Sequence, residues 1–327
     1  MRQTWVAAVV RAGMMLALVL AGQAMAQVKE EPLRLETPTG TLAGTLALPG
    51  SSGKPPVVLI IAGSGPTDRD GNSAMLPGHN DSLNMLATAL AEAGFASLRY
   101  DKRGVGASLA ATPAESALRF DTYVDDAAAW IARLNADPRF GAVTVLGHSE
   151  GALIGMMAAQ RGGAAAYVSI AGIADGTGTI LRRQLAGKLP PELAAANERI
   201  LASLEGGTTV ADVPAQLMVF YRPSVQPYLV SQLRIQPAAE LAKLRIPVLV
   251  VQGTTDIQVG VDQAKALKLA KQDAQLSIIP GMNHVLKDVP ADSQRQLASY
   301  GDPALPLAPG LVPAITGFLR GLPAAQR

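Results

Sequence analysis

The chain contains no cysteine, and aromatic residues make up only 4% of its 327 residues. Without cysteine the protein can form no disulfide and cannot carry a lipid on a thiol. Its stability must come from the hydrophobic core, and we expect that core to be mainly aliphatic because aromatic residues are scarce. Histidine is also rare, with only His79, His148 and His284 present. Few side chains can therefore act as a base near neutral pH.

An excess of charge of one sign is absent as well. The chain has 28 Lys and Arg residues against 26 Asp and Glu, which gives a formal net charge of +2. Removal of residues 1–26 would take away Arg2 and Arg11 and no acidic residue, and would leave a net charge of zero. Nothing in this balance predicts a nucleic-acid partner, because such binding relies on clustered basic side chains.

Residues 1–26 have the pattern of a secretory signal peptide. Arg2 and Arg11 precede an apolar run over residues 12–22, and Ala24-Met25-Ala26 has the small-x-small pattern of a cleavage site. The run is too short to span a bilayer comfortably, which favours a cleaved signal over an uncleaved membrane anchor. We therefore expect a secreted, periplasmic protein that has no stable membrane anchor after cleavage.

Two patterns of apolar residues predict a sheet. Residues 32–36 and 41–48 alternate around a Pro-Thr-Gly turn, which is typical of an antiparallel edge hairpin. The continuous run at residues 57–61 predicts a strand buried on both faces, as in a parallel sheet; further strand patterns are residues 96–100, 143–146, 165–170, 246–251 and 275–279. Helical patterns separate the runs, at residues 81–93, 119–135, 152–161, 261–271 and 311–319. The expected fold is α/β, with a doubly wound, mostly parallel sheet.

Residues 175–243 interrupt this alternation. The segment contains no buried strand pattern, and it is helical in composition and broken by prolines. We interpret it as a helical cap inserted between two parts of a core, residues 27–174 and 244–327. Its aromatic side chains, in residues 217–221 and at Tyr228, could roof an apolar pocket or pack the cap onto the core.

The stretch Gly147-His148-Ser149-Glu150-Gly151 has the Gly-x-Ser-x-Gly pattern of a nucleophile elbow. A strand pattern precedes it and a helical pattern follows it, which is the context that this motif requires. The glycines allow the strand and the helix to approach each other closely. Ser149 would then lie at a helix N-terminus, where the N–H groups favour developing negative charge.

Asp256 and His284 follow later strands, so the chain order is serine, acid, histidine. A serine hydroxyl needs a base to take its proton, and His284 suits that role. Asp256 would hold the correct tautomer of His284 and stabilise the imidazolium. Asp262 is the alternative acid, but Asp256 directly follows a strand and a glycine turn. The other two histidines are interpreted differently: His148 as a structural residue and His79 as a surface or rim residue.

The loop after the strand at residues 57–61 is rich in glycine and predicts half of an oxyanion hole. The expected donors are the backbone N–H groups of Ser64 and Glu150. Further along this loop, Asp68-Arg69-Asp70-Gly71-Asn72 resembles a calcium loop, but the EF-hand spacing fails at its sixth and twelfth positions. The glycines at residues 104–106 begin a dinucleotide-type fingerprint that Leu109 breaks. Neither a metal nor a cofactor is predicted.

Together these motifs resemble the α/β-hydrolase superfamily over nearly all of the mature chain. More narrowly, the chain is similar to bacterial esterases and to S33-type, serine-aminopeptidase-like hydrolases. The resemblance lies in the loop at residues 63–72, the Asp-x-Arg-Gly-x-Gly-x-Ser turn at residues 101–108 and the Gly-His-Ser-Glu-Gly elbow. It implies Ser149, Asp256 and His284 as a catalytic triad. One departure is Ala62, where many relatives have a histidine before the oxyanion glycine.

We therefore expect a serine hydrolase without a cofactor that cleaves small carboxylic esters through an acyl-enzyme on Ser149. An amide or peptide hydrolase acting on short peptides is an alternative, in which Glu150, Asp68 or Asp70 would hold the substrate amine. A catalytically silent binding protein on the same fold is a third possibility. The serine nucleophile disfavours epoxide hydrolase and dehalogenase chemistry, which use a carboxylate. The sequence makes no prediction of oligomeric state.

Overall fold

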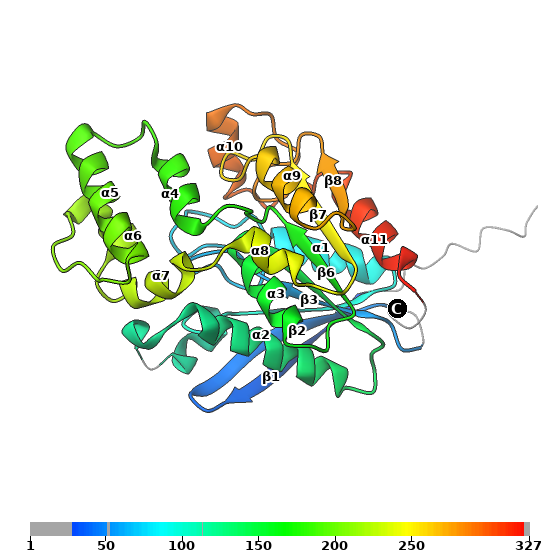
Figure 1. Cartoon of the computed structure of the whole chain (residues 1–327). Helices are drawn as coiled ribbons and strands as arrows, with labels where there is room; N and C mark the ends of the chain where they lie inside the picture. The colour runs from blue at the N-terminus through cyan, green and yellow to red at the C-terminus, as the bar shows by residue number, and fades with distance from the viewer. Residues whose placement is uncertain (1–27, 51–52, 113, 324–327) are drawn as a thin grey trace, which may run out of the picture.

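The structure is a computed structural model that describes residues 28–50, 53–112 and 114–323. Its centre is an eight-stranded sheet in the order β1-β2-β4-β3-β5-β6-β7-β8 (Figure 1). The strands are β1 (Lys29–Thr37), β2 (Gly40–Leu48), β3 (Val57–Ile61), β4 (Ala96–Tyr100), β5 (Val143–His148), β6 (Ala166–Ile170), β7 (Val248–Gly253) and β8 (Gln275–Ile279). Strands β3 to β8 run parallel to one another. The predicted doubly wound, mostly parallel α/β fold is confirmed.

The hairpin of β1 and β2 is present, but only β1 lies at the edge of the sheet. β2 pairs antiparallel with β4 on its other side, with Leu46 opposite Leu98. Leu42 and Leu46 are fully buried, whereas Thr41, Ala43 and Thr45, which alternate with the buried positions, are partly exposed. The period-two alternation of the sequence thus sets one face of the hairpin against the core and the other toward water.

Every residue of β3 to β7 is buried, as continuous apolar runs predict for strands covered on both faces. β8 forms the second edge and is only partly buried. Because parallel strands all end at the same edge, the loops that follow β3, β5, β7 and β8 meet there. The predicted site residues lie in these loops.

Helices cover both faces of the sheet. α1 (Ser82–Glu92) and α11 (Leu311–Gly321) pack on one face. On the other lie α2 (Phe120–Asn135), α3 (Glu150–Gln160) and α9 (Val261–Ala270). Aliphatic side chains dominate both layers, with Trp130 and Tyr100 as a rare aromatic pair whose ring centroids lie 5.7 Å apart. A further helix, α10 (Ser293–Ser299), is not predicted by the apolar pattern because its buried residues, Gln296 and Ser299, are polar.

Residues between β6 and β7 form helices that stand beside one end of the sheet (Figure 1). They are α4 (Thr177–Leu185), α5 (Pro191–Glu205), α6 (Met218–Tyr221), α7 (Gln226–Leu233) and α8 (Pro237–Ala242). A short 3₁₀ helix at Ala215–Leu217 precedes α6, and two more lie between β4 and α2, at Gly106–Ala111 and Glu115–Ala117. The helices that we call the cap, α4 to α7, share a small core of their own, in which Ile200, Leu204 and Leu217 are fully buried. α8 returns to the sheet layer and packs against α3 and α9.

The predicted signal peptide, residues 1–26, lies outside the described residues. Within the ranges that the structure describes, we find no helix with both the length and the apolar character needed to cross a membrane.

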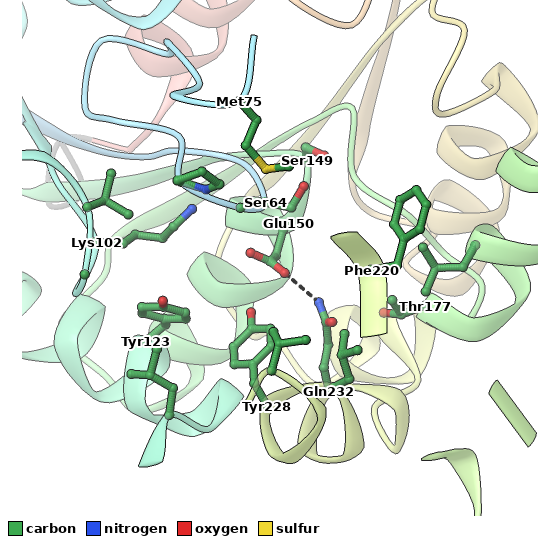
Figure 2. A pocket seen from close by; sticks show the side chains of 18 of the residues that line it. Ser64, Met75, Lys102, Tyr123, Ser149, Glu150, Thr177, Phe220, Tyr228 and Gln232 are labelled. Carbon is green, nitrogen blue, oxygen red and sulfur yellow. Dashed lines mark hydrogen bonds between the residues drawn. The ribbon is translucent and has the colours of Figure 1, made fainter. Parts of the chain in front are cut away.

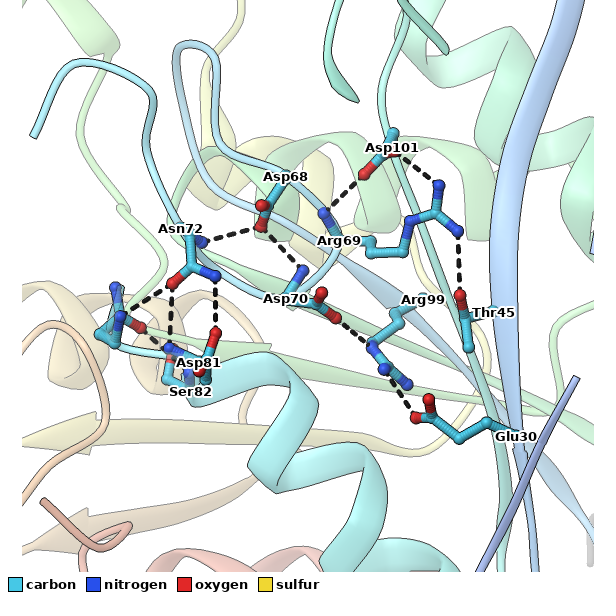
Figure 3. A network of polar contacts seen from close by, with 11 residues as sticks. Glu30, Thr45, Asp68, Arg69, Asp70, Asn72, Asp81, Ser82, Arg99 and Asp101 are labelled. Carbon is cyan, nitrogen blue, oxygen red and sulfur yellow. Dashed lines mark hydrogen bonds and ion pairs between the residues drawn. The ribbon is translucent and has the colours of Figure 1, made fainter. Parts of the chain in front are cut away.

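The polar loop between β3 and α1 is tied to the sheet by buried charges (Figure 3). Asp101, at the end of β4, accepts hydrogen bonds from the Arg69 backbone N–H at 2.8 Å, from Arg69 Nη2 at 2.6 Å and from the Ala107 N–H at 2.8 Å. Arg99 in β4 pairs with Asp70 of the loop and with Glu30 of β1. These contacts tie the loop to the end of β4 and, through Arg99, to β1.

Within the same loop, Asp68 accepts hydrogen bonds from the backbone N–H groups of Asp70 and Asn72, both at 2.9 Å. Asn72 in turn donates to Asp81 at 2.7 Å, immediately before α1 (Figure 3). The carboxylates that resemble a calcium loop are therefore engaged in holding the chain. Nowhere in the described ranges do three or more His, Cys, Asp or Glu side chains gather as metal ligands would.

We expect Asp101→Ala to lower the free energy of unfolding by about 3–5 kcal/mol, because it removes a buried carboxylate and leaves the partly buried Arg69 guanidinium and two backbone N–H groups without an acceptor. Chemical denaturation monitored by circular dichroism measures this change. Asp125→Ala is the matched control, since Asp125 pairs with Arg161 at the surface and its loss should cost no more than about 1 kcal/mol. Equal effects of the two substitutions would contradict the assignment.

Candidate active site

Ser149 lies at a sharp turn between β5 and α3. Its backbone has φ 55° and ψ −121°, a conformation that non-glycine residues rarely adopt. The glycines on either side of Ser149 permit the turn. A Cβ on Gly151 would lie 2.2 Å from the carbonyl oxygen of Ile61, and one on Gly147 would lie 2.1 Å from that of Gly151. The Gly-x-Ser-x-Gly stretch thus adopts the elbow geometry that its sequence context predicts.

Asp256 and His284 lie together at the same edge of the sheet. Asp256 follows β7 and His284 follows β8, and His284 Nδ1 lies 2.8 Å from Asp256 Oδ2. Both side chains are buried. Since a carboxylate can only accept, Nδ1 carries the hydrogen and Nε2 is left free to accept a proton.

Asp256 is held by further donors besides His284. Its Oδ1 accepts from the backbone N–H groups of Gln258 at 2.8 Å and Val259 at 2.9 Å, and Gln252 Nε2 lies 3.1 Å from Oδ2. Burial alone would raise the pKa of the Asp256 carboxyl, but His284 and the two backbone donors outweigh it and lower the pKa. The carboxylate therefore stays ionised and fixed in place.

The alternative acid, Asp262, is not near His284. It lies in the first turn of α9, its side chain is 68% exposed, and it faces Arg183 of the cap at 3.5 Å. Of the two candidate carboxylates, the structure therefore places only Asp256 beside the histidine.

His148 precedes Ser149 and supports the backbone of His284. Its Nε2 lies 2.8 Å from the carbonyl oxygen of His284, and the two rings lie 4.9 Å apart. Because the carbonyl can only accept, Nε2 carries the hydrogen. Burial and the neighbouring His284 lower the pKa of His148 to about 3, so the ring is neutral near pH 7. The third histidine, His79, is exposed in the polar loop.

The loop after β3 approaches the elbow closely. A Cβ on Gly63 would lie 3.3 Å from the Cβ of Ser149, so only a residue without a side chain allows this approach with ease. In the described part of the chain, the backbone N–H groups of Ser64 and Glu150 donate to no protein acceptor. The N–H of Ser149, by contrast, bonds to the carbonyl of Ile170 at 2.9 Å. The two predicted oxyanion donors are therefore available.

Lys102 supports this loop from behind, and the sequence analysis does not identify it. The side chain is buried, and Nζ donates to the carbonyl oxygen of Gly63. That carbonyl belongs to the same peptide group as the N–H of Ser64. Burial lowers the pKa of Lys102, and the nearby Glu150 carboxylate opposes this effect. A lysine at the end of a buried strand is a weak signal in a sequence, because most such lysines reach solvent.

A cavity of about 770 Å³ opens beside Ser149 and extends between the core and the cap (Figure 2). Its apolar walls come from both parts and include Leu118, Leu153, Ile180, Val225 and Leu229. Phe220 and Tyr228 also line it, and Tyr228 packs against Phe120 and Tyr123 of α2 with ring centroids 6.0 and 5.5 Å apart. The aromatic side chains of the cap therefore both line the pocket and pack the cap onto the core.

One carboxylate enters this cavity next to the elbow. Glu150 Oε1 accepts a hydrogen bond from Gln232 Nε2 of α7 at 2.9 Å, and the hydroxyls of Tyr123 and Tyr228 point toward the same region (Figure 2). Asp68 and Asp70, the other acidic residues considered for amine binding, are engaged in the polar loop and do not line the cavity.

Comparison with solved structures gives the same fold. The α/β hydrolase GrgF from Penicillium sp. sh18 has a TM-score of 0.56 at 22% identity and covers 83% of this chain and 98% of its own. Est1E from Butyrivibrio proteoclasticus has a TM-score of 0.55 at 20% identity, covering 82% and 94%. At these identities the similarity establishes the fold alone.

Sequence comparison is more specific. Esterase EstD of Thermotoga maritima is 29% identical over 249 residues, which are 75% of this chain, and the chain spans 58% of the length of that protein. The family model described as serine aminopeptidase, S33, matches residues 76–288, a range that includes Ser149, Asp256 and His284. This chain is therefore a member of the S33 serine aminopeptidase family of α/β hydrolases.

Proposed function

We propose that the protein is a serine hydrolase that cleaves small carboxylic esters through an acyl-enzyme on Ser149. The observation that carries the proposal is the bond between His284 Nδ1 and Asp256 Oδ2 at the sheet edge that also holds the elbow. The relative EstD is named an esterase, which supports ester substrates for this chain. The apolar cavity beside Ser149 suits the hydrocarbon part of such an ester.

In the first half of the reaction, Ser149 Oγ attacks the ester carbonyl carbon while His284 Nε2 takes its proton. Asp256 holds the ring in the required tautomer and stabilises the imidazolium. The carbonyl oxygen becomes an oxyanion, which the N–H groups of Ser64 and Glu150 stabilise. The intermediate then expels the alcohol, which receives its proton from His284 and leaves the acyl group on Ser149.

In the second half, water replaces the alcohol. His284 takes a proton from the water as it attacks the acyl carbon, and the same two N–H groups stabilise the second oxyanion. Collapse of this intermediate releases the carboxylic acid and returns the proton to Ser149. No metal or cofactor takes part in the scheme.

Lys102 is proposed to act as a positioning residue. Its hydrogen bond to the Gly63 carbonyl fixes the peptide group whose N–H, that of Ser64, faces the oxyanion, and it polarises that group in the same direction. The lysine itself need not contact the substrate.

Amide or peptide hydrolysis is a second candidate, favoured by the position of Glu150 in the cavity wall. Its carboxylate could pair with the ammonium group of an aminoacyl substrate. Aminoacyl p-nitroanilides test this directly. Turnover of leucine or proline p-nitroanilide with kcat/KM above that of p-nitrophenyl butyrate would favour the second candidate, and no turnover would leave the ester proposal alone.

We expect the mature protein to hydrolyse p-nitrophenyl esters and Ser149→Ala to show no turnover above background, a loss of about 10⁴-fold or more. Release of p-nitrophenol is followed at 405 nm for a series of acyl chains from acetate to octanoate. The comparison of the two proteins tests the nucleophile, and the dependence on chain length reports the size of the pocket. Ser64→Ala is the matched control. Only the backbone N–H of Ser64 is used, and alanine keeps it, so kcat should fall less than about threefold. Full activity of Ser149→Ala would refute the proposal.

We expect Lys102→Met to lower kcat by about tenfold or more with little change in KM, because part of one oxyanion donor's contribution is lost. Steady-state kinetics on p-nitrophenyl butyrate, together with the unfolding midpoint of each variant, measure the effect. Lys102→Arg retains a buried donor and should restore part of kcat. A fall in stability with kcat unchanged would show that Lys102 has only a structural role.

A further inference from the structure

Tyr228 of α7 has a buried hydroxyl group without a partner. The side chain is 8% exposed and lines the cavity, and its hydroxyl bonds to no other group in the described part of the chain. Two other buried tyrosines are paired: Tyr221 donates to Asn197 Oδ1 at 2.7 Å and Tyr167 to the carbonyl of Ala152 at 2.6 Å. The buried hydroxyl of Tyr100 also lacks a partner among the described residues, but Tyr100 does not line the cavity. Because burying a polar group without a partner is unfavourable, the hydroxyl of Tyr228 is an open hydrogen-bonding position in the cavity wall.

The nearest complementary group is Glu150. Figure 2 shows the Tyr228 hydroxyl pointing toward the Glu150 carboxylate. Glu150 Oε1 already accepts from Gln232 Nε2 at 2.9 Å, whereas Oε2 accepts from no other residue that the structure describes. The acceptor oxygen and the phenolic hydroxyl thus face each other without the geometry of a direct hydrogen bond, next to the serine that we propose as nucleophile.

The chemistry of these two groups favours one kind of ligand. Burial and the Glu150 charge raise the pKa of Tyr228 well above its usual value, so the phenol remains protonated and can donate. A ligand hydroxyl can donate to Glu150 and accept from Tyr228 at once. An ammonium group can only donate, so the Tyr228 hydrogen would have to share the Glu150 carboxylate with it. Lys102, a basic residue, also lines the cavity and further opposes a cation.

We propose that Glu150, Gln232 and Tyr228 form a subsite for a substrate hydroxyl group. The preferred esters then carry a hydroxyl on an otherwise apolar chain, because the walls around the subsite are aliphatic. This inference rests on the proposed ester hydrolysis and names its substrate class. The hydroxyl could belong either to the acyl part or to the alcohol part of the ester, and the subsite would recognise it in the same way in both cases.

Matched ester pairs test the subsite and identify the part that carries the hydroxyl. Ethyl 3-hydroxyoctanoate and ethyl octanoate differ in the acyl part, and 3-hydroxybutyl acetate and butyl acetate differ in the alcohol part. We expect kcat/KM, measured by pH-stat titration, to favour the hydroxylated member of one pair by about tenfold. Ethyl 3-aminooctanoate is the cationic comparison. Preference for the amine over the hydroxyl ester would overturn the proposal.

Tyr228→Phe separates a ligand-binding role from a structural one. It removes only the hydroxyl. The ratio of kcat/KM for the hydroxylated ester to kcat/KM for its plain partner should therefore fall toward one, while the unfolding midpoint does not decrease. Tyr221→Phe is the matched control in the same cap: it loses a hydrogen bond to Asn197, so the midpoint should fall and the ratio should not change. A lower midpoint for Tyr228→Phe with an unchanged ratio would overturn the proposal.

Calorimetric titration of Ser149→Ala with the same esters keeps this test independent of turnover. Tighter binding of a hydroxylated ester, lost in the Ser149→Ala/Tyr228→Phe double variant, supports the subsite even if no ester is hydrolysed. If the parent hydrolyses plain esters but both members of each pair react at equal rates and bind equally, the proposed function stays intact and the subsite is overturned.

Discussion

The close packing of the elbow against β3 is the constraint on which the site depends. Gly151 lies so near the carbonyls of Ile61 and Ala62 that no side chain fits there, and this contact holds Ser149 in its unfavourable backbone conformation. The same contact brings the loop after β3 to the elbow, so Gly63 approaches Ser149. Such strain persists only where the surrounding structure fixes it, and here a parallel sheet buried on both faces does so.

Buried polar groups around the elbow then orient one another. His148 is neutral and bonds to the backbone of His284, while Asp256 is ionised and bonds to its ring. Lys102 bonds to the peptide group whose opposite end offers the Ser64 N–H. Each of these groups is too deeply buried to be left unpaired at little cost. A pre-organised site of this kind needs little rearrangement when charge develops during a reaction.

Much of this architecture could be predicted from local sequence. Continuous apolar runs identify the central strands, and the turn residues around Ser149 identify the elbow, because both depend on neighbours within a few positions. Lys102 and Gln232 could not be found in this way, and for Tyr228 the sequence indicates a place in the pocket roof or in packing but not its position beside Glu150. Their contacts join β4, the cap and the elbow over long sequence separations, and nothing near them in the chain indicates a partner. α10 was missed for a related reason, since its buried side chains are polar.

The most direct test of the account is to map a covalent adduct on the native protein. A fluorophosphonate ester should react once, and peptide mass spectrometry should place the adduct on Ser149. The rate of labelling should fall strongly in His284→Ala, because the serine then lacks its base. An adduct on another residue, or no adduct on folded protein, would contradict the claim that Ser149 is an activated nucleophile.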